Sequence, residues 1–215
     1  MLAEAADRLA LQEVVSVASF GDLVGLTAEC DAVGVDIPIG LSESGRRTAD
    51  VQARKLLGGA RASSVFPSPI RAVLSCTGYR EACDVSARLS GRMISKQTFA
   101  LVPKIREANQ TMTPALQRRV VEVHPEVSFR ALNDSVTISV SKHLAAGVEY
   151  RESLLIPVFG EYLSLHPRPA GAQPHDLYDA CAAAWTAWRV AQGTARRVPK
   201  TPEVDARGLR MEIVY

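Results

Sequence analysis

Residues Ala32–Ile39 read AVGVDIPI, an apolar run that is interrupted by one carboxylate, Asp36. Such a run is typical of a parallel strand that is buried on both faces. Pro38 cannot donate a ladder hydrogen bond, so we expect the strand to end near it. Asp36 then lies at the carboxyl end of the strand, where open α/β sheets place their ligand crevice. A carboxylate there needs a loop to cap, an arginine partner or a bound cation.

A second stretch repeats this pattern. Residues 119–124 read RVVEVH and predict another buried strand, and Pro125 then opens the helix PEVSFRAL. Glu122 and His124 are two residues apart, so a strand places them on one face. Glu126 falls in the first helical turn, where its charge favours the helix dipole. For His124 the alternatives are a buried, hydrogen-bonded imidazole and a functional group.

The rest of the chain alternates between predicted strands and helices. We expect further strands at 14–20 and 211–215, loops at 61–71 and 160–175, and helices over 49–57, 77–89, 97–109, 151–159 and 176–192. This alternation predicts an α/β fold with a largely parallel sheet. A length of 215 residues favours a single domain, residues 1–215.

Composition narrows the class of protein. The chain is 47% hydrophobic and 22% charged, which excludes a disordered protein. No run of 18 apolar residues occurs, so we expect no membrane partner. The first 15 residues, MLAEAADRLALQEVV, lack the apolar core of a secretory leader. The four cysteines form no CxxC pair, which fits free thiols. We therefore expect a cytoplasmic protein. The net charge of +2 means that any nucleic-acid surface must be local.

Two more carboxylates complete an acidic set. Asp176 and Asp179 lie at the start of an alanine-rich helix and share one of its faces. The alternative to a ligand role is that they are the acidic residues commonly found at a helix N-terminus. The alanines allow that helix to approach the sheet closely. With Asp36 and Glu122, these side chains offer the oxygen ligands that Mg²⁺ or Mn²⁺ prefers. Two such ions can hold an in-line attack on a phosphodiester.

Basic side chains could hold the phosphates of such a substrate, because guanidinium forks match phosphate oxygens. The candidates are Arg46, Arg54, Arg61, Lys104 and Arg151. A solvated surface charge is the alternative for each. The segment GLSESG (40–45) lacks the Lys-Ser/Thr ending of a P-loop, so nucleotide-dependent phosphotransfer ranks last among the hypotheses.

Several long segments together resemble one family, catalogued as domain of unknown function 429. They are VGVDIPIGL (33–41), DVQARKLLGGARASSVFPSPIR (50–71), SKQTFALVPKI (95–105), VVEVHPEVSF (120–129), HDLYDACAAAWTAWR (175–189) and the tail DARGLRMEIVY (205–215). The resemblance covers residue 14 to the end of the sequence. It implies a nuclease with a ribonuclease H-like fold, in which helices flank a mixed sheet.

Ribonuclease H-like folds take their metal carboxylates from the first strand, the fourth strand and the last helix. The resemblance places Asp36 at the fourth-strand position and Asp179 at the helix position, with Asp176 one turn earlier and Glu122 as an additional ligand. The first two strands and their aspartate have no counterpart before Asp36. The resemblance therefore implies an N-terminally incomplete fold, whose unpaired strand edge favours homo-oligomers.

Two functional hypotheses follow. In the first, the protein is a metal-dependent nuclease: Asp36, Glu122 and Asp179 bind Mg²⁺ or Mn²⁺, Asp176 assists, and His124 moves a proton. The alternative is a catalytically inactive nuclease-fold module that binds nucleic acid or a protein partner. The missing aspartate and the low net charge motivate this alternative.

Overall fold

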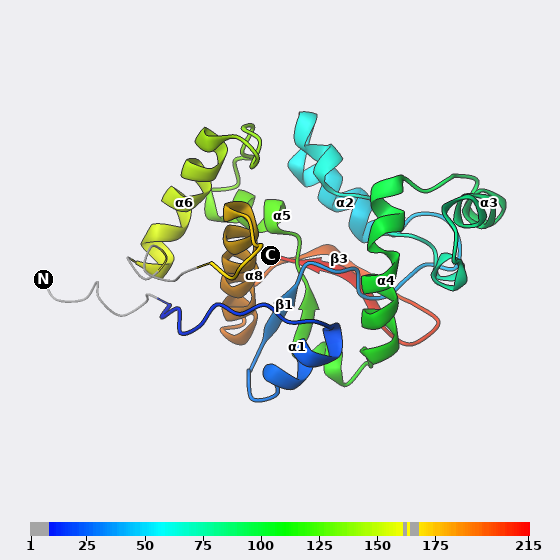
Figure 1. Ribbon diagram of the computed structural model, residues 1–215, viewed down its shortest axis with the longest axis horizontal. Coiled ribbons are helices and arrows are strands. Elements are labelled where there is room, and N and C mark those ends of the chain that lie inside the picture. The colour runs from blue at the N-terminus through cyan, green and yellow to red at the C-terminus, as the bar shows by residue number, and fades with distance from the viewer. Residues whose placement is uncertain (1–8, 161–162, 164–167) are drawn as a thin grey trace, which may run out of the picture.

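The computed structural model describes residues 9–160, 163 and 168–215 (Figure 1). Its α-helices are α1 (Phe20–Leu26), α2 (Thr48–Leu57), α3 (Tyr79–Ser90), α4 (Lys96–Thr111), α5 (Pro125–Leu132), α6 (Ala145–Phe159) and α8 (Pro174–Ala191). Its strands are β1 (Val33–Val35), β2 (Val120–Glu122), β3 (Arg197–Val204) and β4 (Arg210–Val214). Short 3₁₀ helices cover Gly59–Ser64, Arg71–Ser75 and Leu116–Arg118. The prediction of a mixed α/β protein is confirmed.

The four strands lie at the centre of the molecule. β1 pairs with β2 in parallel, with Val35 opposite Glu122, and β3 pairs with β4 antiparallel. One parallel bridge between Val123 and Val214 joins the two pairs, so the strands follow one another in the order β1, β2, β4, β3. The two predicted parallel strands therefore end at the same edge, as the sequence pattern requires.

Helices flank these strands on two sides. In the view of Figure 1, α6 and α8 lie to the left of β1, α3 and α4 lie to its right, and α2 lies above the strands. Helix α8 approaches β1 so closely that a Cβ atom built on Gly34 would lie 2.6 Å from the carbonyl oxygen of Ala183. The small side chains of both elements permit this contact, as the alanine pattern predicts. It fixes the position of α8 relative to the end of β1.

Local sequence explains where several helices begin and end. The Ser19 hydroxyl accepts a hydrogen bond from the Asp22 N–H at 3.1 Å and so caps α1. Ser95 caps α4 in the same way, and Pro125 occupies the first turn of α5. Gly91 ends α3 with a φ of 72°, which glycine adopts without strain.

The predicted strand at 14–20 is wrong. Residues 9–17 have no regular secondary structure, and Phe20 already belongs to α1. The segment instead packs Leu9, Leu11 and Val14 against the hydrophobic cluster of α5, α6 and α8. The Leu9 N–H also donates to the Val158 carbonyl oxygen at 2.9 Å. The β-branched residues of this segment predicted a strand, but the segment packs against helices and pairs with no strand of the described chain.

Two other differences concern proline-rich stretches. The tail before Met211 reads RVPKTPEV, and it forms β3, a strand that the sequence analysis missed because of Pro199 and Pro202. Proline is tolerated in an edge strand, where one row of N–H groups needs no partner. The predicted loop at 160–175 falls partly outside the described residues, and its final part is the first turn of α8.

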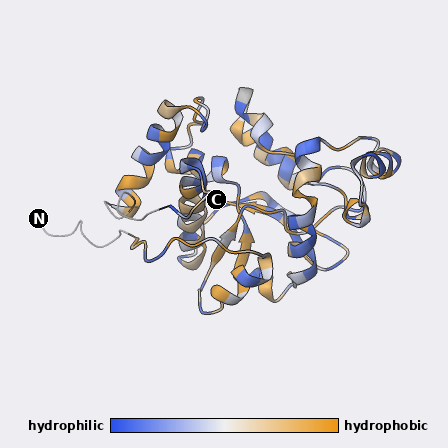
Figure 2. Cartoon of the chain, in the orientation of Figure 1, coloured by the Kyte–Doolittle hydropathy of each residue, from blue (hydrophilic) through white to orange (hydrophobic). Residues whose placement is uncertain are grey.

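Hydrophobic residues are concentrated along β1 and β2, whereas the helices alternate between hydrophobic and hydrophilic residues (Figure 2). One buried cluster joins α5, α6 and α8 through Phe129, Leu155 and Phe159. Another surrounds the β1–β2 pair, with Val33 and Val120 at its centre. Among the described helices, none combines the length and the apolar composition of a membrane span.

Candidate functional site

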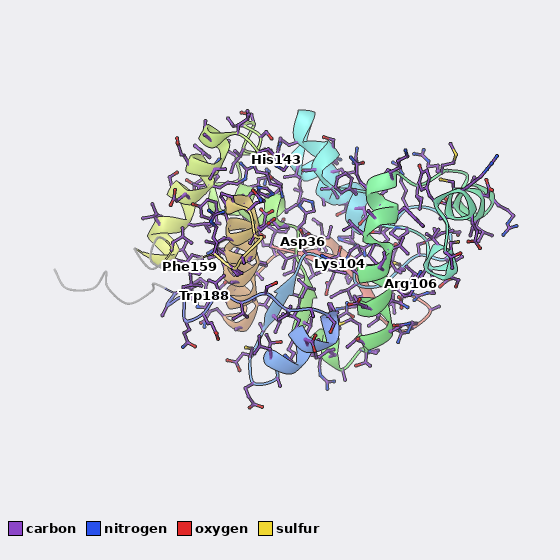
Figure 3. The ribbon with its side chains drawn as sticks, in the orientation of Figure 1. Asp36, Lys104, Arg106, His143, Phe159 and Trp188 are labelled. Atoms are coloured by element: carbon purple, nitrogen blue, oxygen red, sulfur yellow. The ribbon has the colours of Figure 1, made fainter. Side chains whose placement is uncertain are left out.

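A pocket of about 290 Å³ opens at the carboxyl ends of β1 and β2. We call it the carboxylate pocket. The charged and imidazole side chains that line it are Asp36, Asp50, Glu122, His124, Glu126 and Lys142. Its wall is the proline-rich loop 64–69. Figure 3 shows Asp36 near the centre of the molecule, where β1 ends. The pocket thus lies where the two strand-end carboxylates were predicted to meet.

Asp36 is the carboxylate of this pocket that has no partner. It forms no hydrogen bond and no ion pair with any described residue. Its side chain faces the pocket space and is exposed there, yet protein surrounds the pocket on most sides. The resulting loss of water raises the pKa of Asp36, against the opposing effects of His124 and Lys142. Asp36 is therefore available to a ligand.

Asp179 lies on α8 and does not line the carboxylate pocket, but it contacts Lys142, which does. Its Oδ2 atom accepts a hydrogen bond from Lys142 Nζ at 2.5 Å, while its buried Oδ1 atom has no hydrogen-bond partner. Burial raises the pKa of Asp179, Lys142 lowers it, and the negative charge of Asp36 raises it further. The two carboxylates therefore lie close enough to sense each other, and each has an oxygen free of hydrogen bonds from the described residues.

His124 lines the pocket, and a contact of one of its ring nitrogens defines its tautomer. Its Nε2 atom lies 3.2 Å from the Ser64 carbonyl oxygen, which can only accept, so Nε2 carries the proton of the neutral ring. The Nδ1 atom is then the proton acceptor, and it is buried without a hydrogen-bond partner. In its protonated form His124 would lower the pKa of Asp36, so the two groups lie close enough to interact. This geometry suits a group that accepts a proton within the pocket.

Glu122 is fully engaged. Arg47 donates to Glu122 Oε1 at 2.5 Å and to Oε2 at 3.0 Å, and the Ile39 N–H donates to Oε2 at 2.7 Å. Arg47 also pairs with Asp50 at 3.1 Å. Burial raises the pKa of Glu122, against the effect of Arg47. Burial likewise opposes the charge of Arg47, but Asp50 and Glu122 raise the pKa of Arg47 above its ordinary value. Both oxygens of Glu122 are thus occupied by the protein.

Glu126 anchors a second buried network. Arg151 Nη2 donates to both oxygens of Glu126, at 2.7 and 2.9 Å, and the Arg151 side chain is 0% exposed. Its Nη1 atom donates to the carbonyl oxygens of Gly147 at 2.9 Å and Val140 at 3.3 Å. Arg151 therefore has no surface with which to contact a substrate. It holds instead the chain segment that presents Lys142 to the carboxylate pocket.

The other predicted phosphate-binding residues lie in different surroundings. Arg61 pairs with Glu126 at 2.9 Å, and Arg54 donates to a backbone carbonyl oxygen of the pocket wall at 2.6 Å. Lys104 is exposed on α4 and lines neither of two adjacent pockets (Figure 3). Arg46 is exposed and lines the second of these pockets. The structure therefore does not gather these residues into one cluster.

Asp176 caps the helix that carries Asp179. Its Oδ2 atom accepts a hydrogen bond from the Gln173 N–H at 2.8 Å, and 55% of its side chain is exposed. This is the alternative role that its position in the first turn indicates.

Sequence reasoning missed Lys142 and Arg47. Nothing in SKH or GRRTAD distinguishes these residues from ordinary surface charges, because their partners lie 37 and 75 residues further along the chain.

The donor set bears on the predicted metal ion. Within residues 9–160, 163 and 168–215, no three His, Cys, Asp or Glu side chains gather closely enough to hold a metal ion. Asp36 and Asp179 nevertheless offer oxygens without hydrogen bonds from the described residues, and Asp179 Oδ1 is buried in that state. Mg²⁺ is commonly bound by one or two carboxylates, with waters and substrate phosphates as its other ligands. This pair of carboxylates fits that mode of binding.

The fold and the pocket define a class: a mixed α/β protein with an acidic pocket at the ends of parallel strands. Comparison with protein families matches residues 1–204 to the family described as protein of unknown function (DUF429), and the chain belongs to this family. The search of curated proteins and the search of solved structures returned no match.

Proposed function

We propose that the protein is a metal-dependent nuclease with a ribonuclease H-like fold, which hydrolyses phosphodiester bonds with Mg²⁺ or Mn²⁺. The observation that carries the proposal concerns Asp36, which lines the recess at the strand ends without a hydrogen-bond partner among the described residues, and whose charge raises the pKa of Asp179 on α8. The parallel pairing of β1 with β2 matches the fourth and fifth strands of such a fold, and α8 supplies the helix carboxylate.

In this proposal Asp36 and Asp179 hold the metal ion. The ion supplies a Lewis acid for the phosphate and lowers the pKa of a water molecule when it is bound. We leave Glu122 and Asp176 out of the metal ligands that the sequence predicted. Arg47 and the Ile39 N–H occupy both oxygens of Glu122, and Asp176 caps α8. Glu122 instead fixes the end of β2 beside Asp36.

The remaining pocket side chains have separate roles in hydrolysis. The oxygen of a water molecule attacks phosphorus, the bond from phosphorus to the leaving sugar oxygen breaks, and that oxygen takes a proton from solvent. His124 Nδ1 accepts the proton that the attacking water loses. Lys142, with 29% of its side chain exposed, stabilises the negative charge on the phosphate. Its bond to Asp179 keeps the ammonium group in place.

The test is cleavage of single-stranded, duplex and branched DNA and RNA in the presence of Mn²⁺. We expect wild type to cleave at least one of these substrates. Asp36→Asn and Asp179→Asn should each lower the rate by at least about 100-fold, since even outer-shell changes at metal sites cost about 10- to 100-fold. The matched control is Asp176→Asn, which removes an acid from the same helix but keeps a good capping residue.

Two results would contradict this proposal. The first is equal cleavage by wild type and Asp36→Asn, which would remove Asp36 from the reaction. The second is the absence of any metal-dependent cleavage combined with the absence of Mn²⁺ binding in calorimetric titration. That second result would favour the catalytically inactive module that binds nucleic acid or a protein partner. The occupation of Glu122 by Arg47 and of Asp176 by the helix cap is the observation that favours this alternative.

We also propose that the protein forms a homo-oligomer through β1. Within the described residues, β1 has β2 as its only strand partner. An apolar strand with a free edge favours association, because its unpaired N–H and C=O groups can accept another strand. Sedimentation velocity across a range of concentrations tests this proposal. A monomer at every concentration would contradict it.

A further inference from the structure

A second pocket, of about 740 Å³, lies beside the carboxylate pocket. Basic and hydroxyl side chains supply its polar lining, and we call it the basic pocket; these residues are Arg46, Ser68, Ser86, Ser90, Arg92, Ser95 and Thr98. No Asp or Glu lines it, whereas four acidic side chains line the carboxylate pocket. The basic pocket is therefore lined by positive charge, whereas the carboxylate pocket is lined mainly by acidic side chains.

The two guanidinium groups of the basic pocket have no partner in the part of the chain that the structure describes. Arg46 and Arg92 are exposed, and neither side chain forms an ion pair or a hydrogen bond with a described residue. Three arginines that line neither pocket are engaged instead: Arg47, Arg61 and Arg151 each pair with a buried carboxylate. Two free guanidinium groups on one concave surface suit an anion with several oxygens, such as a phosphate.

The two pockets share a wall. Pro67, Ser68, Pro69 and Thr98 line both of them. The Ser68 N–H donates to Asp50 Oδ2 at 2.7 Å, which fixes this wall to α2. The Ser68 hydroxyl oxygen is buried and has no hydrogen-bond partner. A ligand that passes from one pocket to the other would therefore find an unsatisfied hydroxyl group along its path.

An aromatic ring lies next to this wall. Phe66 lines the carboxylate pocket and is 42% exposed, although it is a large hydrophobic residue. Pro67, the next residue in the chain, limits the movement of the backbone at this point. An exposed ring at the mouth of a polar pocket offers a face on which a planar ligand can stack. The ring thus stands where a ligand that spans the two pockets would pass.

We infer that the two pockets together bind one single-stranded nucleic acid. One phosphate lies at Lys142 in the carboxylate pocket, an adjacent phosphate lies between Arg46 and Arg92, and an unpaired base stacks on Phe66. The inference rests on the proposed nuclease function, because it takes the carboxylate pocket as the place of cleavage. It adds the substrate class and the residues that select it.

Stacking on Phe66 decides between a strand and a duplex. A base in a duplex has both faces covered by its neighbours, so it cannot stack on the ring until it leaves the helix. A single strand already offers free bases, and its flexible backbone can place neighbouring phosphates in the two pockets. A free mononucleotide carries the same phosphate and base but spans the pockets less completely. The experiment therefore includes it as a separate ligand.

The test is binding without cleavage, measured by fluorescence anisotropy in EDTA with labelled 12-nucleotide strands of DNA and RNA. A 12-base-pair duplex and a mononucleotide serve as competitors. We expect a strand to bind and an unlabelled strand to displace it at least about 10-fold better than either competitor, because base stacking contributes about 5- to 100-fold per base. Binding should weaken as salt is raised, because the phosphate contacts release counterions.

Variants assign the binding to these residues. Arg46→Ala combined with Arg92→Ala should weaken strand binding at least about 10-fold and reduce the salt dependence by about one unit of slope. The matched control is Arg118→Ala, which removes an exposed arginine from a 3₁₀ helix outside both pockets. Phe66→Ala should weaken binding about 5-fold or more, and Phe66→Leu should fail to restore it, because leucine lacks a flat ring.

The outcomes separate this inference from the proposed function. Strand binding that the arginine and Phe66 variants lose supports the inference, even where Mn²⁺ produces no cleavage and the nuclease proposal fails. Cleavage that Asp36→Asn abolishes, together with unchanged binding in the Arg46, Arg92 and Phe66 variants, overturns the inference and leaves the nuclease proposal standing. Equal displacement by strand and mononucleotide overturns it too, as does the absence of strand binding.

Discussion

Asp36 and Glu122 end two neighbouring parallel strands, and both line the carboxylate pocket, yet their surroundings are opposite. Glu122 has a guanidinium group and a backbone N–H on its oxygens, at 2.5 to 3.0 Å. Asp36 has no hydrogen-bond partner among the described residues. One strand end therefore contributes to the stability of the fold, and the other keeps a carboxylate available for a ligand. The same sequence pattern, an apolar run with one acid before a proline, has produced both.

The difference comes from a third element. Arg47 lies directly before α2, and it extends to the end of β2, not to the end of β1. A carboxylate without such a partner is costly in a recess, so its retention points to a role beyond folding. The number of donors around each acid therefore separates structural acids from those available to a ligand, and four substitutions test this rule.

The largest effect is expected for Arg47→Met. This change leaves Glu122 and Asp50 buried without their cation, and breaking a buried ion pair in this way costs about 3 to 5 kcal/mol of stability. Urea unfolding at pH 7 measures the loss. The neighbouring exposed residue gives the control, because Arg46→Met should change stability by less than about 0.5 kcal/mol. Equal stability of the two variants would break the comparison between the two strand ends.

Asp205→Asn extends the comparison to an acid with many donors. Although burial works to raise the pKa of Asp205, the N–H groups of Leu209, Leu41 and Arg207, together with Arg71, lower it below its ordinary value. The ionised form therefore stabilises the fold. We expect the variant to lose about 2 to 3 kcal/mol at pH 7, because several buried donors lose a charged acceptor.

The pH dependence gives the sign of this effect. A carboxyl group with a lowered pKa in the folded state contributes its stability above the pKa of the unfolded chain and loses it as the pH falls. The difference in unfolding free energy between wild type and Asp205→Asn should therefore shrink between pH 5 and pH 3. A constant difference across this range would mean that the charge of Asp205 has no part in stability.

Gly34→Ala examines the packing of α8, which carries Asp179, against β1, which precedes Asp36. The added Cβ would lie 2.6 Å from the Ala183 carbonyl oxygen, so α8 must move away from β1. We expect a loss of about 1 to 3 kcal/mol, the usual cost of overpacking. Thermal unfolding measures it, and Gly25→Ala is the control, because a Cβ there meets no atom within 4 Å. Equal melting temperatures would contradict the close contact.

The smallest effect, and the one of opposite sign, is expected for Asp36→Asn. The raised pKa of Asp36 means that its charged form is unfavourable in the folded protein, so wild-type stability falls as the pH rises through that pKa. The variant should exceed wild type at pH 8 by less than about 1 kcal/mol, because solvent screens an exposed group. The gain should vanish near pH 3. A variant less stable than wild type at pH 8 would assign Asp36 a structural role.

Sequence patterns could predict the elements that end at the pocket. Pro38 and Pro125 each follow an apolar run, and these two stretches form the parallel pair whose ends line the pocket. The same patterns failed for residues 14–20 and for β3. A strand needs a neighbour as well as β-branched residues, and local composition contains no information on which element will lie alongside.

The division of labour among the acids could not be predicted. The partners of Glu122, Glu126 and Asp179 are Arg47, Arg151 and Lys142, which lie between 25 and 75 residues away along the chain. Helical or strand periodicity relates residues only a few positions apart, so such pairs leave no local signal. The predicted metal ligands and phosphate-binding residues therefore came from residue type, from position at a strand end or helix start, and from the family resemblance.

The residues that line the carboxylate pocket are spread along the chain. The first is Asp36, directly after β1, and the last is Ile213 in β4. A nascent chain leaving the ribosome therefore cannot display this pocket until residue 213 has been synthesised and has taken its place beside β2.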